Sequence, residues 1–110
     1  MKKTVYYEAE DDILFVHNGY SDDEKFKGNI DIGDFILDIS NKGKIKGIEV
    51  LNASEVLKQY GLTREVLVGL KDAILLVRMY KKAIHLSINF IFDEKEIPAL
   101  VTVPLEEAIA

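Results

Sequence analysis

Hydrophobic and polar residues alternate along most of this chain with the period of two that is typical of β-strands. The alternation is clear over residues 26–32, where Phe26, Gly28, Ile30 and Ile32 are separated by polar side chains. Short apolar runs bounded by charged or glycine-containing turns complete the pattern. Together these features predict strands over Thr4–Ala9, Ile13–His17, Phe26–Ile32, Phe35–Ile39, Lys44–Leu51, Ile74–Tyr80, Ala83–Phe92 and Ala99–Val103.

The middle of the chain has the spacing of short helices. Asn52 followed three residues later by Glu55 is a good helix start, because both side chains can bond otherwise unpaired amide groups. Gly61 is placed to end that helix, and Thr63 can cap a second one with the apolar stripe Val66, Leu67 and Leu70. The order of elements predicts an α+β fold: a mostly antiparallel β-meander, a short helical middle of one or two short helices, and three further strands.

The turn Asn41–Lys42–Gly43 sets the register of the hairpin between 35–39 and 44–51. With Gly43 in the left-handed conformation of a three-residue loop, Ile39 lies opposite Ile45, Asp38 opposite Lys46, and Ile36 opposite Ile48. This register is favourable because it pairs unlike charges and packs apolar side chains together.

Glu49 is the one carboxylate that this register places on an apolar face, with Phe35, Leu37, Ile39, Ile45 and Leu51. A buried carboxylate is costly unless it is paired. Two interpretations follow. Either the face curves to solvent there and Glu49 meets a lysine or a backbone amide, or Glu49 is a buried anchor for an arginine or lysine of a partner.

Composition limits the range of functions. The chain has 110 residues, a net charge of -5 and no cysteine, which predicts a single domain, 1–110, without disulfides or thiolate metal sites. The acidic balance argues against a dedicated nucleic-acid surface. The start Met1–Lys2–Lys3 lacks the apolar run of a signal peptide, and Lys81, Lys82 and His85 interrupt the most hydrophobic third. We therefore expect a cytoplasmic protein that does not cross a membrane.

No motif for catalysis, metal or cofactor binding is present in the sequence. Neither His17 nor His85 has the spacing of a metal ligand or a nucleophile beside it, and both are interpreted as ordinary strand residues. No nucleophile elbow, phosphate loop or dinucleotide fingerprint occurs. The acidic clusters lack the spacing of a calcium loop, and we expect hydrated turns at Glu8, Glu10, Asp11 and Asp12 and at Asp22, Asp23 and Glu24.

The last predicted strand has the properties of an interface. Pro98 and Pro104 flank it, and proline is confined to edges and strand ends because it lacks an amide hydrogen. An edge strand is usually guarded by charge, yet this one is apolar on both faces. Such a strand can pair with its copy in a homodimer or dock a partner by strand addition, through Leu100, Val101, Thr102 and Val103. The alternative is that these side chains are buried within the same chain.

The first half of the chain also resembles a known family. The residues that carry the resemblance are Tyr7–Val16, Asp38 and Gly43–Ser54, where a Gly-x-x-x-Gly-Ile-Glu strand leads into Asn-Ala-Ser. Over about residues 4–60 the chain resembles the YuzE-like family, domain of unknown function 2283, with residues 61–110 as a helix and strand extension. The resemblance implies a small β-meander plus helix without an established activity. Some members resemble antitoxin-type partners of small toxins.

Three hypotheses of function follow. The first is a non-enzymatic interaction module, a homodimer that binds a small basic protein in the manner of an antitoxin. The second is a ligand-binding or weakly catalytic protein with a pocket on the sheet, formed by Tyr6, Tyr7, His17 and Glu49. The third is DNA autoregulation through residues 54–70 as a helix-turn-helix, although Glu55, Glu65 and Asp72 there offset Lys58, Arg64 and Lys71.

Overall fold

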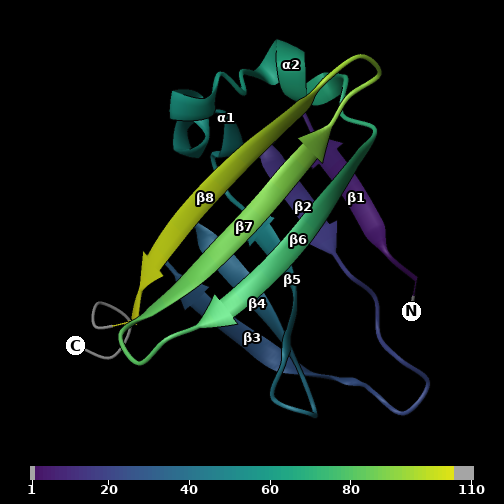
Figure 1. Ribbon diagram of the computed structural model, residues 1–110, viewed down its shortest axis with the longest axis vertical. Coiled ribbons are helices and arrows are strands. Elements are labelled where there is room, and N and C mark those ends of the chain that lie inside the picture. Colours follow the sequence, from purple (N-terminus) through teal and green to yellow (C-terminus); the bar gives the residue numbers. More distant parts are fainter. Residues whose placement is uncertain (1, 106–110) are drawn as a thin grey trace.

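The computed structural model describes residues 2–105, whose strands form two antiparallel sheets (Figure 1). The five-stranded sheet has the order β1-β2-β5-β4-β3. Its strands are β1 (Thr4–Glu8), β2 (Ile13–His17), β3 (Phe26–Ile32), β4 (Phe35–Ser40) and β5 (Ile45–Val50). The three-stranded sheet has the order β6-β7-β8, with β6 (Asp72–Met79), β7 (Ala83–Ile91) and β8 (Glu96–Pro104). Each predicted strand is present, and the last begins three residues before Ala99.

The five-stranded sheet is not the simple meander that the sequence predicts. The hairpin β1–β2 and the run β3–β4–β5 each join strands that are consecutive in the chain, but β5 lies between β4 and β2, so β2 and β3 are not neighbours. This pairing places Leu14 opposite Val50 and Val16 opposite Ile48, and all four side chains are buried. The sheet gains apolar cross-strand contacts in this order. Residues 18–25 carry the chain from β2 to the far edge at β3.

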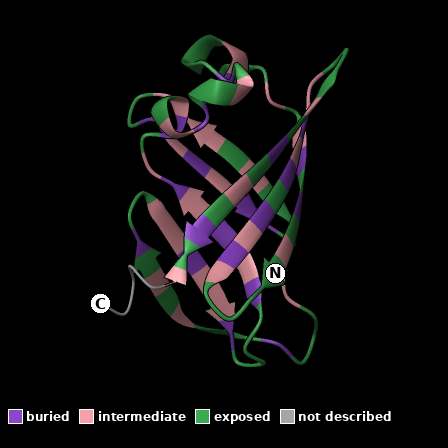
Figure 2. Ribbon diagram, turned by 60° about the vertical axis from the view of Figure 1, so that its left-hand side comes forward, coloured by how far each residue is buried: buried purple, intermediate pink, exposed green. Residues whose placement is uncertain are grey.

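The three-stranded sheet lies across one face of the five-stranded sheet, and the short helices cover one end of the pair (Figure 1). Buried residues alternate along the strands that face the space between the layers (Figure 2). One hydrophobic core fills that space and draws on both halves of the chain, including Leu14, Leu37, Ile48, Leu57, Leu67, Leu75, Leu86, Ile88 and Phe90.

The helical middle consists of α1 (Ala53–Val56), a 3-10 helix η1 (Lys58–Tyr60) and α2 (Arg64–Val68). The Thr63 hydroxyl caps α2 by accepting from the Val66 amide, and Gly61 adopts φ 75° at the end of η1, as predicted. Asn52 does not cap α1, because its backbone is left-handed and its side chain makes no cap bond. With α2 only five residues long and Leu67 buried, residues 54–70 pack on the sheets instead of forming a recognition helix.

A β-bulge shifts the register of the β4–β5 hairpin by one residue. Ile39 lies opposite Ile45 as predicted, and Gly43 has φ 75°, but Asp38 then pairs with Gly47 and Ile36 with Glu49. Lys46 is the additional residue, and its ammonium lies 3.2 Å from the buried carboxylate of Glu24. The predicted Asp38–Lys46 pair was therefore wrong, since a bulge is invisible to side-chain matching along a regular ladder.

No helix within residues 2–105 has the length and apolar character needed to cross a membrane.

Candidate functional site

The candidate site lies on the face of the five-stranded sheet that is turned away from the core, here called the outer face. The register assigns to it Thr4, Tyr6, Glu8, Ile13, Phe15, His17, Asn29, Asp31, Ile36, Asp38, Gly47 and Glu49. Four of these positions are carboxylates and none is lysine or arginine. The outer face therefore combines apolar surface with uncompensated negative charge.

A hollow of about 490 Å³ opens on this face. The rings of Tyr6 and Phe15 form one side with their centroids 6.1 Å apart, and Tyr6 is 55% exposed. The remaining lining comes from Thr4, Glu8, Val16, His17, Asp38, Ile48 and Glu49. Aromatic rings beside carboxylates suit a ligand that is both cationic and apolar, because a cation is attracted to the ring face as well as to the acid.

Glu49 lies on the outer face, opposite Phe15 and Ile36, and not with Phe35 and Leu37 as predicted. The bulge at Lys46 moved it to the other side of the sheet. No hydrogen bond or ion pair reaches its carboxylate from any residue in the range 2–105. Burial raises the pKa of Glu49, and the nearby charges of Asp38 and Asp31 raise it further. Neither a lysine nor a backbone amide of residues 2–105 meets the half-buried Glu49, and its role as an anchor for a partner stays a prediction.

His17 lies at the end of β2, as expected, but its buried side chain also lines the hollow. Tyr20 packs edge-on against its ring at 4.8 Å. Gly47 also lies against this ring, since an added Cβ there would fall 2.4 Å from the His17 Cδ2 atom. Gly47 thus has no side chain because the imidazole occupies that space.

The hydrogen bonds of His17 fix what its ring can do. Nδ1 accepts from the Gly19 amide at 2.8 Å, so the proton of the neutral ring is on Nε2. Burial lowers the pKa of His17 and favours this neutral form, although Asp38 opposes the shift. Nε2 has no hydrogen-bond partner and lies 3.9 Å from Asp38. In this form Nε2 can donate a hydrogen bond, but it cannot accept a proton or coordinate a metal ion.

Tyr7 is separated from this site. It points from β1 to the opposite face, where its hydroxyl donates to Asp12 at 2.6 Å. Of the four residues in the predicted pocket, Tyr6, His17 and Glu49 line the hollow and Tyr7 does not.

Asp12 is not a hydrated turn residue as expected, because its side chain is buried among donors. Its carboxylate accepts from the Tyr7 hydroxyl at 2.6 Å, the Ser54 hydroxyl at 2.6 Å and the Ser54 amide at 3.0 Å. Burial opposes the charge, yet the Ser54 and Tyr7 bonds hold the pKa of Asp12 below its usual range. The same environment, burial first, raises the pKa of Tyr7 to about 12. Asp12 thus provides the cap of α1 that Asn52 was predicted to provide.

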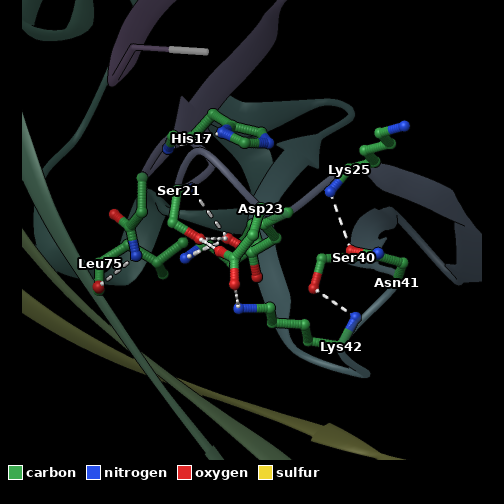
Figure 3. A network of polar contacts seen from close by, with 12 residues as sticks. His17, Ser21, Asp23, Lys25, Ser40, Asn41, Lys42 and Leu75 are labelled. Carbon is green, nitrogen blue, oxygen red and sulfur yellow. Dashed lines mark hydrogen bonds and ion pairs between the residues drawn. The ribbon is translucent and has the colours of Figure 1, made fainter.

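Glu24 was also expected in a hydrated turn and is buried instead. One carboxylate oxygen accepts from the Ser21 amide at 3.2 Å and pairs with Lys46 at 3.2 Å. Figure 3 shows the surrounding contacts, in which Asp23 pairs with Lys42 at 2.7 Å and Lys25 donates its amide to Asn41. These bonds fasten the loop 18–25 to the β4–β5 hairpin beside the hollow.

The carboxylate of Glu24 is expected to account for part of the loss of folding stability at acid pH. The nearby Ser40 hydroxyl, followed by the Ser21 amide and Lys46, lowers the pKa of Glu24 from 4.5 to about 2. Its contribution to stability is therefore complete above the unfolded pKa and is lost as the pH falls through the folded value. We expect Glu24→Gln to lower the free energy of unfolding at neutral pH and to flatten its acid decline. Urea unfolding at successive pH values measures this. An equal change in the exposed control Asp22→Asn would contradict it.

The predicted interface strand β8 is an edge of the three-stranded sheet. Leu100 and Thr102 are exposed, Val101 is half-buried, and Val103 belongs to the core. The Leu100 carbonyl already accepts from the Tyr60 hydroxyl at 2.5 Å. Backbone groups alternate along a strand, so Pro98 and Pro104 share the outward orientation of Leu100 and offer no donor. Pairing along this edge stays a prediction, and only Leu100 and Thr102 could supply outward amides from 98 to 104.

Within residues 2–105, no group of three or more histidine or acidic side chains is arranged to hold a metal ion.

The chain is similar to the uncharacterized protein MJ0789 of Methanocaldococcus jannaschii. The two are 33% identical over 69 residues, which covers 61% of this chain and 57% of that protein. The chain thus matches little more than half of that relative's length. No family model matches the chain, and no solved structure matches it. The resemblance of the first half to the YuzE-like family is therefore unconfirmed and stays a prediction.

Proposed function

We propose that this protein is a non-enzymatic interaction module whose outer face binds a basic protein segment, with Glu49 as the anchor for an arginine or lysine side chain. The observation that carries the proposal is a carboxylate without a counter-charge at the side of a largely apolar hollow. Glu49 is half-buried, and partial burial of a carboxylate without a counter-charge is costly in the free protein. An incoming cation removes that cost. The binding energy would come from this release.

The aromatic rim supports the choice of a cationic side chain. Tyr6 and Phe15 line the hollow together with Glu49, so one arginine could stack on a ring while its guanidinium bonds to the carboxylate. Asp38 and Glu8 add negative charge on the same hollow. The net charge of -5 would increase the rate of encounter with a basic partner.

The form of His17 supports binding over catalysis. An imidazole with its proton on Nε2 and its Nδ1 lone pair engaged is not available as a general base. It can orient Asp38 or donate to a bound ligand. A small cationic ligand in the same hollow is the alternative, and it predicts that an isolated amino acid binds as well as a peptide does.

The test compares two acid-to-amide variants that change the net charge equally. Glu49→Gln should weaken the binding of hexa-arginine about ten- to a hundredfold, since a charged hydrogen bond contributes roughly 1.5–3 kcal/mol. Glu94→Gln, in the exposed turn between β7 and β8, should leave the dissociation constant nearly unchanged. Isothermal titration calorimetry measures both.

Two results would contradict the proposal. Equal weakening in the two variants would show binding driven by net charge alone. Absence of binding by the unaltered protein at low ionic strength would remove the outer face as a cation-binding surface. Arginine amide binding as tightly as hexa-arginine would favour the small-ligand alternative.

A further inference from the structure

The second exposed sheet surface is the side of the three-stranded sheet that faces away from the core. Its positions form rows across β6, β7 and β8, and the two central rows are Ile74–Asn89–Pro98 and Leu76–Ser87–Leu100. Ile74 is 45%, Leu76 60% and Leu100 55% exposed. No described element covers this surface. Large apolar side chains that cluster in this way on a sheet mark an interaction surface.

The charges on this surface are separated along the strands. The row Asp72–Ile91–Glu96 lies at one end and carries two carboxylates, whereas the row Arg78–His85–Thr102 lies at the other end. Arg78 is exposed and has no ion pair within residues 2–105. Asp72 uses Oδ1 for both the Lys3 ammonium and the Ala73 amide, which leaves Oδ2 available. Along the strands, the surface therefore carries carboxylates at one end and Arg78 at the other. Its middle holds apolar side chains on β6 and β8 on either side of the polar Asn89 and Ser87 of β7.

We infer that this surface binds a second copy of the chain, face to face, around a two-fold axis that runs across the strands between the two central rows. That rotation places each row against the row at the mirrored position of the copy. Ile74 then meets Leu76, Pro98 meets Leu100, and Asp72 meets Arg78, with each contact made twice. An interface of this kind matches apolar surface with apolar surface and opposite charges with one another.

The charge order selects this axis over the other two-fold arrangement. An axis along the strands would exchange β6 with β8 and bring Asp72 against Glu96 of the copy. Like charges in an interface are strongly unfavourable, whereas the axis across the strands makes two Asp72–Arg78 pairs. The contact uses Leu100 and Thr102 of β8 through their side chains and leaves the edge of that strand free.

The test is a charge exchange measured by sedimentation velocity at low ionic strength. The unaltered protein should sediment as a dimer. Arg78→Glu should weaken association at least about tenfold, because it places two carboxylates together twice. Asp72→Arg should also weaken association, because it places the introduced arginine against Arg78 of the copy. The double variant Asp72→Arg/Arg78→Glu restores opposite charges and should recover the dimer. Val68→Glu is the control, since Val68 is 66% exposed on α2 and outside this surface.

A monomeric unaltered protein, an association unchanged by Arg78→Glu, a double variant that stays dissociated, or a dissociated Val68→Glu would each overturn the inference. Thermal unfolding checks that every variant is folded. Arg78→Glu removes no ion pair within residues 2–105, so it carries the test alone if Asp72→Arg unfolds. Dimer formation and cation binding by the outer face are tested separately. Arg78→Glu should leave hexa-arginine binding in place, and Glu49→Gln should leave the dimer intact.

Discussion

Replacing Asp12 by alanine is expected to destabilise the protein by about 3–5 kcal/mol, because it removes a buried acceptor of three hydrogen bonds. Tyr7 and Ser54 would keep their donors without partners, and each unsatisfied donor costs about 1–3 kcal/mol. Alanine would also have to adopt the φ of 57° found at this position, which adds roughly 1–2 kcal/mol. Urea unfolding at neutral pH measures the loss.

Two variants separate these contributions. Asp12→Asn keeps an acceptor and tolerates the left-handed backbone, so it should lie between the alanine variant and the unaltered protein. Asp11→Ala removes the neighbouring exposed carboxylate and should change the free energy of unfolding by less than about 0.5 kcal/mol. Similar losses for Asp11→Ala and Asp12→Ala would show that the turn as a whole matters, not the buried carboxylate.

Replacing Gly47 by alanine is expected to cost about 1–3 kcal/mol or more, and to displace the ring of His17 from the hollow. The added Cβ would lie 2.4 Å from the His17 Cδ2 atom and 3.1 Å from the Val16 carbonyl oxygen. The backbone of β2 cannot move without breaking its ladder, so the imidazole has to leave. We expect a lower midpoint of thermal unfolding and a changed NMR signal for the His17 ring.

A double variant identifies the clash as the cause. His17→Ala should cost stability in the unaltered background but should recover much of the loss caused by Gly47→Ala. Gly28→Ala is the matched control, because an added Cβ there meets nothing within 4 Å. Additive losses for Gly47→Ala and His17→Ala would contradict the role assigned to this glycine.

The sequence was sufficient to predict the elements but not their arrangement. Alternation with a period of two and short apolar runs between turns located the strands, because most strands have one side turned to the core. Nothing in that pattern specifies that β5 pairs with β2, since Leu14, Val16, Ile48 and Val50 are apolar whichever partner they have. The order of strands depends on packing of both layers against a common core, which no local pattern records.

Only part of the candidate site could be predicted from the sequence, because the rest depends on contacts between distant segments. Tyr6, His17 and Glu49 were brought together as predicted, but Glu49 reached the outer face only through the bulge at Lys46. Asp12 and Glu24 looked like turn acids because their donors, Ser54 and Lys46, are distant in the sequence. Gly47 is itself a sequence signal for this site, since a glycine inside a strand often marks the close approach of another group.

NMR chemical-shift mapping with hexa-arginine tests the central claim most directly, because it reports which surface the cation contacts. We predict that the largest changes fall on the amides of Tyr6, Phe15, Asp38 and Glu49 and on the His17 ring, and that they saturate with one dissociation constant. Changes centred on the turns at Asp22 and Glu94, or spread evenly over all exposed acids, would show that the outer face is not a binding site.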